Sequence, residues 1–358
     1  MSNPIFIARQ DTLEQEILPA QWLSQYKLFG EESYTFQDKE IWKRLCMSRA
    51  AANDRDMHAE ALEEMLTTFS AEHTGKWMLT VYGMDAAVLE GLATMAAVAG
   101  NGTAMAAVAG NALLMHAITN SETAMRVIAN SQTAMQRVAN SATAMDAISG
   151  SKIARGAVQA SPYYNSYIKE NDMAIAKLAV ALASLESAGY SGMAGVAADS
   201  TAMNAVAASS TAMTAVAASG VALQAIAKAY KQTADMLKFL QAVNASDTLI
   251  KSIYNTLTKA TTLFAAAQLG AQDDVASANS WATTSAAPNA FLACACGYYS
   301  SGNSVNVTYN GTVIAQKKTG TAKPGSVTST NVNAITMAPS TFTENGDGYL
   351  AVQKFTAK

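Results

Sequence analysis

The sequence predicts a mostly α-helical protein that ends in an all-β domain. Three observations support this: a ten-residue repeat fills the middle of the chain, helical spacing flanks it, and apolar residues alternate near the C-terminus. The predicted parts are a helical N-terminal attachment domain, a shaft of short repeat helices interrupted near 151–190, a helical stem with coiled-coil spacing, and a small β-sandwich tip. Their expected boundaries are 1–90, 91–228, 229–275 and 280–358.

The ten-residue unit is the most informative pattern in the chain. It reads SETAMRVIAN at 121–130, SQTAMQRVAN at 131–140 and SATAMDAISG at 141–150, and it returns as TAMNAVAASS at 201–210. Self-similarity at a short, fixed period is typical of a quasi-one-dimensional array, in which each unit contacts mainly its neighbours. Such arrays form rods, spacers and extended surfaces, which favours a structural role over an enzymatic one.

Each repeat carries a methionine and, three residues later, a valine or an isoleucine. These two positions share one face of an α-helix, whereas the residue just after the methionine varies freely, as a solvent-facing position does. We therefore expect the methionines to pack in a core rather than to bind a soft metal ion. The expected core residues are Met95, Val98, Met105, Val108, Met125, Ile128, Met135, Val138, Met145, Ile148, Met203, Val206, Met213 and Val216.

The junctions between repeats predict breaks between short helices. Asn130-Ser131 and Asn140-Ser141 place a residue that tolerates the left-handed conformation beside a favourable N-cap residue. One continuous helix would instead wind its apolar face around the rod, without the seam of a coiled coil. Each repeat is therefore expected to form a helix of about two turns, closed by Asn or Gly and reopened by Ser. Because an isolated helix of this length is unstable in water, stacking must stabilise the array.

The repeat weakens between 151 and 190. Arg155 takes the position of the methionine, and the segment SPYYNSYIKEND follows, with Pro162 near its start. When the pattern resumes at Met193, it is two residues out of phase with Met145. We interpret 161–172 as a loop or kink between two blocks of repeats.

The N-terminal region, 1–90, resembles a conventional folded domain in composition, since it holds much of the charge and three of the tryptophans. Helical spacing is clear over 54–69. We expect this region to form a docking module. A run of acidic residues crowds one predicted helix and is interpreted as a solvated face rather than as paired catalytic carboxylates; it comprises Asp54, Asp56, Glu60, Glu63 and Glu64.

Apolar residues with heptad spacing follow the repeats. Two interpretations are open: an oligomeric coiled-coil stem, and an αα-hairpin within the chain, for which Ser246-Asp247 offers a break and a new helix cap. In the stem interpretation, the residues at the contact between chains are Met236, Phe239, Val243, Ile250, Ile253, Leu257 and Phe264.

The C-terminal region switches to a period of two. The expected strands are AFLACACGYY, SVNVTY, TVIAQKK, NAITMAP and GYLAVQKF. Asn310-Gly311 lies between two of these strands and predicts a hairpin with a type I′ turn. The acidic loop at 344–348 does not have the spacing of an EF-hand, so we expect an ordinary turn there rather than a calcium site.

Neither a catalytic residue nor a ligand for a cofactor or a metal ion stands out. The cysteines, Cys46, Cys294 and Cys296, form no disulfide framework, and no histidine clusters with them. Among the histidines, His116 occupies the variable repeat position. The net charge of −3 gives no basic footprint for nucleic acid. The uncharged stretch 91–118 is long enough for a bilayer, but its Asn, Gly and Ala content argues against a membrane span.

The decapeptides TAMQRVANSATAM and TAMNAVAASSTAM carry a resemblance to a known class of proteins. They resemble the Ala-rich repeats of tail-fibre and related appendage proteins of tailed bacteriophages. The resemblance covers about 91–150 and 191–227. It implies a structural virion protein that assembles as a homotrimer, contacts other virion proteins through 1–90, and contacts a host surface glycan or protein through 280–358. The shaft is short, and an enzymatic tail-spike region is missing.

Several alternatives follow from the same pattern. Within a virion, the protein is either a host-binding fibre or a collar, baseplate or capsid decoration component that binds no receptor. A bacterial surface adhesin or spacer is a second class, although the N-terminus MSNPIFIARQ lacks the pattern of a signal peptide, and we expect synthesis in the host cytoplasm. A third is an ice- or surface-binding protein with a flat row of threonines; the row would comprise Thr103, Thr123, Thr133 and Thr143.

Overall fold

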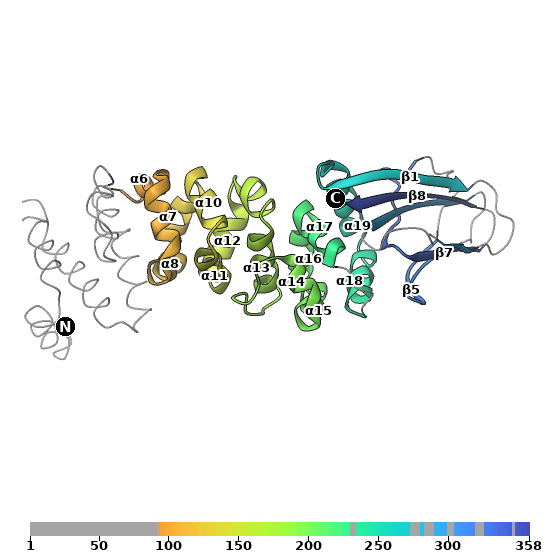
Figure 1. The fold of residues 1–358 in the computed structure, drawn as a ribbon, viewed down its shortest axis with the longest axis horizontal. Coiled ribbons are helices and arrows are strands. Elements are labelled where there is room, and N and C mark those ends of the chain that lie inside the picture. The colour runs from red at the N-terminus through yellow and green to blue at the C-terminus, as the bar shows by residue number, and fades with distance from the viewer. Residues whose placement is uncertain are drawn as a thin grey trace, which may run out of the picture. The chain divides into compact units, whose positions relative to one another are not determined.

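The computed structural model describes most of the chain from residue 92 onward, and the chain divides into two compact units, Met1–Tyr167 and Ile168–Lys358 (Figure 1). The predicted N-terminal domain at 1–90, with Cys46 and its acidic residues, lies outside the described part. A mostly helical protein with a C-terminal antiparallel β region is confirmed. The described residues are Leu92, 94–229, 234–272, 280–282, 290–298, 304–318, 326–345 and 348–358.

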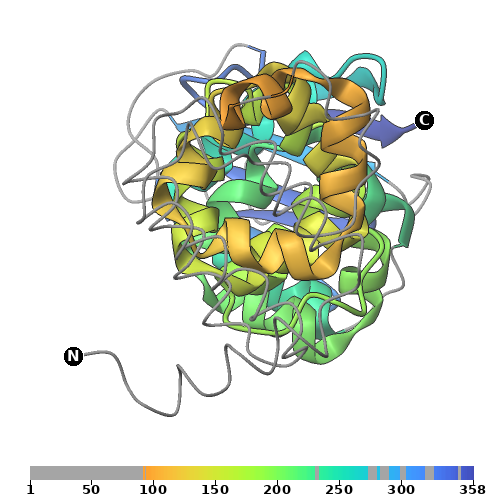
Figure 2. The same ribbon diagram turned by 90° about the vertical axis from the view of Figure 1, so that its left-hand side faces the viewer.

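The described part of the first unit is a solenoid of short helices. Helices three apart in the chain stack on one another: α7 contacts α10, α8 contacts α11 and α9 contacts α12. Three repeats therefore complete one turn, and Figure 2 shows these helices winding around a common axis. The helices are α6 (Met95–Gly100), α7 (Gly102–Gly110), α8 (Ala112–Thr119), α9 (Glu122–Ala129), α10 (Gln132–Ala139), α11 (Ala142–Gly150) and α12 (Lys152–Ala160).

The helices begin where the sequence predicts N-caps. Asn101 and Asn111 cap α7 and α8, and a serine caps each of the next four helices, because the side-chain oxygen accepts a hydrogen bond from a backbone N–H of the first turn. The ends differ from the prediction. Asn130 has φ −92°, so it does not adopt the left-handed conformation. Its Nδ2 instead donates to Arg126 O at 3.0 Å, which closes the helix through the side chain.

All fourteen expected core residues of the repeats are buried, each with at most 3% of its surface exposed. In α7, α9 and α10 two buried alanines accompany the methionine and the aliphatic residue; in α9 they are Ala124 and Ala129. In α11 a buried serine, Ser149, takes the second of these positions. The position after the methionine lies outside this face: Ala96, Ala106 and Gln136 are exposed. Small alanines allow the helix axes to approach closely, so the core consists of many modest side chains rather than a few large ones.

The predicted interruption near 151–190 is partly wrong. Residues 152–160 form the regular helix α12, capped by Ser151, so the array continues through this segment. The expected break at 161–172 consists of turns around a single π-helical turn, η3 (Tyr164–Ile168). Arg155 is tolerated in the methionine position because its guanidinium lies at the helix edge and donates to the carbonyl of Ser149.

The second unit begins with further short helices that again stack at intervals of three. The contacts join α13 to α16, α14 to α17, α15 to α18, and α16 to α19. The helices are α13 (Asp172–Leu182), α14 (Met193–Ala198), α15 (Ser200–Ala208), α16 (Ser210–Ala217), α17 (Gly220–Ala229), α18 (Ala234–Asn244) and α19 (Asp247–Lys259).

The direction of winding reverses within this unit. Ser209, before α16, donates its hydroxyl to Leu182 O at the end of α13 (3.0 Å), and Ser219, after α16, donates to Lys169 O before α13 (2.6 Å). Helices α13 and α16 are therefore antiparallel. By contrast, Thr256 near the end of α19 donates to Ala217 O at the end of α16 (2.8 Å), so these two helices run in the same direction. The segment 183–192 makes the reversal.

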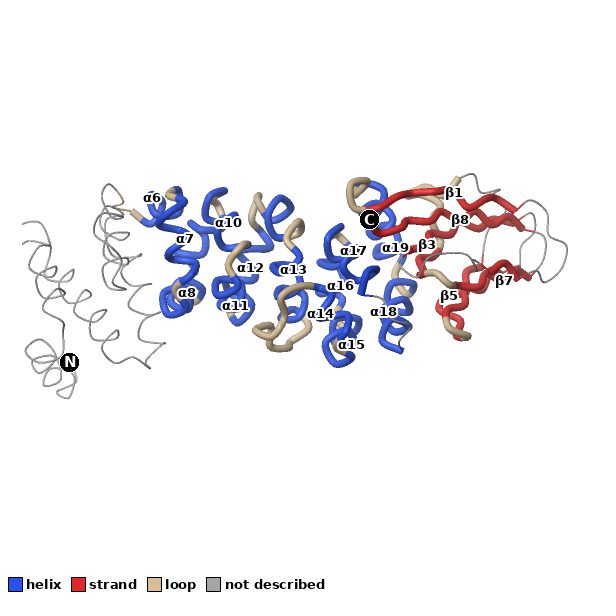
Figure 3. Tube along the Cα trace, viewed as in Figure 1, coloured by secondary structure: helices blue, strands red, loops and turns tan. Residues whose placement is uncertain are grey.

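Two four-stranded antiparallel sheets follow, with the orders β1-β8-β3-β6 and β2-β7-β4-β5 (Figure 3). The predicted hairpin between β4 and β5 is confirmed, since Asn310 and Gly311 have φ of 47° and 74°, as a type I′ turn requires. The strands are β1 (Phe264–Gln272), β2 (Ser280–Ala282), β3 (Ala290–Tyr298), β4 (Ser304–Tyr309), β5 (Thr312–Lys318), β6 (Ala334–Met337), β7 (Ser340–Asn345) and β8 (Gly348–Ala357).

The predicted boundary between stem and β region is wrong. The last helix ends at Lys259, and residues 264–272, expected to be helical, form β1, which pairs with β8 along its length. Phe264, expected in the stem, is thus the first residue of a strand. Its neighbours Ala265, Ala266 and Ala267 favour a helix locally, but pairing with β8 overrides that preference.

Candidate functional site

A ladder of serine hydroxyls connects successive turns of the first unit. Each donates to a carbonyl 32 residues earlier at 2.5–2.6 Å. In three of the pairs the same oxygen also accepts an N–H from its own helix, as Ser131 does from Ala134 at 3.2 Å. One hydroxyl thus uses its donor and an acceptor site together. The pairs are Ser131 with Ala99, Ser141 with Ala109, Ser151 with Thr119 and Ser161 with Ala129.

The ladder sets the register between turns at every repeat. Apolar packing by Met, Val and Ala is non-directional, so it would tolerate small slips between stacked helices. The serine bond is directional and also satisfies a carbonyl at the end of a helix, where no intrahelical partner exists. From the sequence alone these serines are predicted to be N-caps only. The signal that the sequence offers for the second role is the recurrence of serine at successive repeat junctions.

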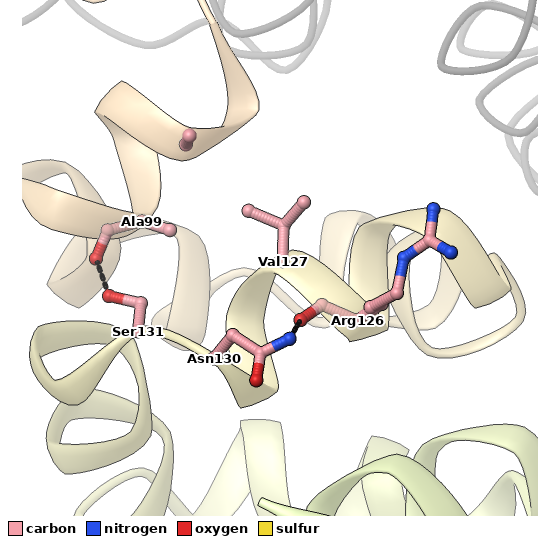
Figure 4. A pocket seen from close by; sticks show the side chains of 6 residues that line it. Ala99, Arg126, Val127, Asn130 and Ser131 are labelled. Carbon is pink, nitrogen blue, oxygen red and sulfur yellow. Dashed lines mark hydrogen bonds between the residues drawn. The ribbon is translucent and has the colours of Figure 1, made fainter.

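An open hollow of about 470 Å³ lies between α6 and α9 (Figure 4). In Figure 4 the side chain of Val127 projects into it, whereas the Arg126 guanidinium extends away along α9. The lining polar groups are engaged: Ser131 donates to Ala99 O, and Asn130 donates to Arg126 O. The lining comprises Ala96, Ala99, Arg126, Val127, Asn130 and Ser131. No carboxylate or histidine is among these six, and the one hydroxyl, that of Ser131, bridges two backbone groups, so we interpret the hollow as a gap between repeat turns.

The variable repeat position and the threonine row do not gather into a site. His116 is half-buried, and its Nε2 lies 3.3 Å from Asn120 Nδ2 at the end of its own helix. With three repeats per turn, residues thirty apart lie on one side of the solenoid. Thr103 therefore aligns with Thr133, while Thr123 and Thr143 lie on the other two sides. The flat row of four that an ice-binding surface needs is not formed.

Within the described residues, Asp172, Lys177 and Asp199 lie around the reversal at 183–192. Asp172 accepts a hydrogen bond from Met193 N at 3.0 Å, which ties the start of α13 to the start of α14. Burial raises the pKa of this carboxyl, while that hydrogen bond acts in the opposite direction. A side chain at Gly192 would put its Cβ 2.2 Å from Asp172 Oδ2, so any larger residue requires the Asp172 carboxylate to move.

Two further contacts fix the same segment. Lys177 is only 2% exposed, and its Nζ donates to Ser187 O and Ala188 O at 3.2 and 3.4 Å. The Tyr190 hydroxyl donates to Asp199 Oδ2 at 2.7 Å, which lowers the pKa of Asp199 and raises that of Tyr190. Each group is thus tied to backbone or to a close neighbour. We interpret the cluster as the structural device that turns the chain, not as a reaction centre.

The predicted stem residues lie inside the chain and are not available to a partner. Helix α18 contacts β5 and β6, and α19 contacts β1 and β6 (Figure 1). The side chain of Asn244 makes two hydrogen bonds with the backbone of Ile335: it donates to the carbonyl oxygen at 2.7 Å and accepts from the N–H at 3.1 Å. The prediction of a coiled-coil stem that joins copies of the chain is therefore wrong. The contact between α18 and α19 favours the other interpretation, an αα-hairpin within the chain. Each buried seam residue is at most 4% exposed: Met236, Phe239, Val243, Ile250, Ile253, Leu257 and Phe264.

Within the described ranges, no group of three or more His, Cys, Asp or Glu side chains lies close enough to hold a metal ion. Cys294 is buried in β3. No single helix there is long and apolar enough to span a membrane, but α16 and α17 would pass together by length and composition, with a bend of 97° between them.

The geometry defines a class: a helical-repeat protein whose short helices lead into two antiparallel sheets. The chain matches no protein-family model and no curated protein sequence. The resemblance to phage appendage proteins thus rests on the decapeptides alone.

Proposed function

We propose that this protein is a structural virion protein of a tailed bacteriophage and forms a homo-oligomeric tail fibre or related appendage. The observation that carries the proposal is the serine ladder. The same hydrogen bond recurs at successive repeats and fixes the register between turns. A spacer of defined length needs such a fixed register. The decapeptide resemblance supplies the biological setting, and assembly in the host cytoplasm followed by incorporation into particles belongs to the same proposal.

A mechanical rather than catalytic role is supported by the use of the polar side chains. Serine and asparagine cap and bridge helices, Lys177 and Asp172 hold the reversal, and Asn244 binds the backbone of β6. Enzymes usually concentrate titratable groups with perturbed pKa values around a concave site. Here such groups support backbone segments, so we propose that the protein is not an enzyme.

The proposed division of labour follows the order of the chain. Residues 1–90 would attach to other virion proteins, the repeats would act as the shaft, and the C-terminal β region, as a small sandwich, would contact a host glycan or protein. Because β8 pairs with eight of the nine residues of β1, a fragment intended to test the tip has to include β1 and the covering helices, not only 280–358.

The first test concerns the particle and the assembly state. Antibodies against the full chain should label purified phage particles in electron micrographs, and sedimentation equilibrium should give an oligomer. Label at the tail tip supports a fibre, while label at the collar, baseplate or capsid supports the alternative without receptor binding. Unlabelled particles together with a stable monomer would overturn the proposal and favour a bacterial surface spacer.

The second test concerns the host. The full chain should bind host cells in a sedimentation assay, and an excess of it should slow phage adsorption. Cells of a phage-resistant strain that lacks surface glycan provide the control. A correctly assembled protein that binds neither strain would restrict the role to structure.

A further inference from the structure

Exposed edges of sheets are the surfaces most prone to pair with another chain, and most edges here are protected. In the described part, β1, β6, β2 and β5 lie at the edges of the two sheets. Strand β2 has only three residues, and β6 has four, contacts α18 and α19, and precedes Pro339. Strand β5 carries Lys317 and Lys318. Short strands, covering helices, proline and lysine are the usual means of blocking edge pairing.

Strand β1 differs from the other three. It is nine residues long, FAAAQLGAQ, and carries neither a charge nor a proline. Its first residue, Phe264, is buried and anchors the strand, but the next five residues are all exposed. Since alternate residues of a strand point to opposite faces, both faces of β1 are open to solvent over 265–269. Figure 1 shows β1 as the outermost strand beside β8.

The composition of this open segment suits close approach by another strand. Ala265, Ala266 and Ala267 present small side chains on both faces, and Leu269 leaves 36% of its surface exposed. A register shift between Gln268 and Gly270 limits the regular part to the first half of the strand. On one side this part pairs with β8; on the other, alternate residues direct their N–H and C=O groups outward.

We propose that β1 pairs antiparallel with β1 of a second copy of this chain, so that the two β1-β8-β3-β6 sheets become one continuous sheet. The regular part is self-complementary: about a two-fold axis at Ala266, alanine faces alanine, Phe264 faces Gln268, and no charge meets another. This proposal rests on the proposed function, in which the protein forms a homo-oligomer, and it identifies β1 as the surface through which the copies make contact. The coiled-coil seam cannot serve, because α18 and α19 bury it.

The symmetry of this contact has a consequence for the assembly. An antiparallel β1–β1 pair is isologous, with the same patch on both chains, so it joins copies two at a time. A closed trimer cannot pair β1 with β1 in every chain. The proposal therefore predicts an even number of chains, in contrast to the trimer that the resemblance to tail fibres implies.

The test begins with sedimentation equilibrium of the full chain and of A266K/A267K. Lysines on both faces of β1 place like charges across the pair, and should weaken association by roughly tenfold or more. The matched control is V313K, since Val313 is 51% exposed on β5, an edge strand that already carries Lys317 and Lys318. It should leave association unchanged, and circular dichroism should show the same helix content in all three proteins.

Cysteine cross-linking then locates the axis. Single variants A265C, A266C, A267C and Q268C are oxidised in the full chain, with the wild type, which keeps Cys46, Cys294 and Cys296, as background and V313C as control. Directly opposed residues in an antiparallel pair have Cα atoms roughly 4.5–5.5 Å apart, within disulfide range. One of the four should form a covalent dimer well above background.

The outcomes separate this proposal from the broader one. Even-numbered assembly, loss of it in A266K/A267K and a single cross-linking position support β1 pairing. An oligomer that survives the lysine variant and cross-links nowhere in β1, or a closed trimer, overturns β1 pairing but leaves the proposed function intact. A wild-type monomer at the highest attainable concentration overturns both.

Discussion

The two blocks of short helices use the same local rules but stack in different directions. In the first unit, a donor serine and its acceptor are always 32 residues apart, and stacked helices run in the same direction. In the second unit the serines on either side of α16 lie 27 and 50 residues from their acceptors, and α13 runs antiparallel to α16. The helices, their caps and their buried faces are alike. The difference therefore arises in the segment 183–192, which turns the chain back.

This comparison shows that the stacking surface is indifferent to direction. Methionine, valine and alanine pack without charge or polarity, so a parallel and an antiparallel neighbour bury similar apolar area. A serine hydroxyl at a junction reaches a carbonyl at whichever helix end it meets. Direction must then be set by connections, and Lys177, Asp172 and Gly192 are the residues that hold the unusual one. Four sets of substitutions test this division, from the largest expected effect on stability to the smallest.

The largest effect is expected where the second unit departs most from the array, at the junction of helices and sheets. Phe239 in α18 is completely buried within the core that joins helices to strands. Phe239→Ala should lower the free energy of unfolding by about 3–5 kcal/mol, because it removes a large side chain and leaves a cavity. Urea unfolding followed by circular dichroism measures the change. Lys238→Ala, at an exposed neighbour, should change it by less than about 0.5 kcal/mol; equal effects would refute this account of the core.

A smaller effect is expected in the array itself. Met135→Ala in α10 should cost at least about 2 kcal/mol, since the side chain is fully buried between stacked helices. Met213→Ala in α16 should cost a similar amount if burial matters and direction does not. Gln136→Ala, at the exposed position of the same repeat, provides the control. A much larger cost for one methionine than for the other would show that parallel and antiparallel stacking are not equivalent.

Sequence reasoning predicted features that depend on nearby residues. The Met-to-Val spacing located the buried face, Ser and Asn located the helix starts, and Asn310-Gly311 located a turn, because each is determined within a few residues. It placed Phe264 in a helix, since alanines favour helix locally and the pairing partner in β8 lies about ninety residues away. It identified Ser151 as a cap but missed its bond to Thr119, because the number of repeats per turn depends on packing angles that the period does not specify.

The serine ladder provides the third set of substitutions. Ser151 is 6% exposed, and its hydroxyl oxygen lies 2.6 Å from Thr119 O. Ser151→Ala should cost about 1–3 kcal/mol, since it removes a cap and leaves a buried carbonyl without its donor. In the reversed block, Ser209→Ala should cost less because this serine is half-exposed and water replaces its bond to Leu182. Thermal and urea unfolding of the two variants make the comparison, with Ser210→Ala at an exposed site as control. Equal costs would mean that the ladder contributes capping alone.

The smallest effect concerns pH and the reversal. Because burial raises the pKa of Asp172 above its ordinary value of 3.8, the folded state favours the neutral carboxyl. Its stabilising contribution is present in full below that ordinary pKa and is lost as pH rises through the raised one. Asp172→Asn keeps an oxygen for Met193 N but cannot ionise, so its stability relative to wild type should increase as pH rises across this interval.

Asp199, on the other side of the segment 183–192, has a pKa shifted in the opposite direction, so its pH dependence of stability has the opposite sign. Its hydrogen bond from Tyr190 lowers its pKa, so its contribution is present above the ordinary value and is lost as pH falls through the lowered one. Asp199→Asn should therefore lose stability relative to wild type as pH rises from acid to neutral, while Asp172→Asn gains. Urea midpoints measured at several pH values from about 3 to 7 span the ordinary carboxyl range. Two differences that change with pH in the same direction would show that this turn does not hold the two carboxylates in opposite environments, and would leave Lys177 and Gly192 as the residues that set the reversal.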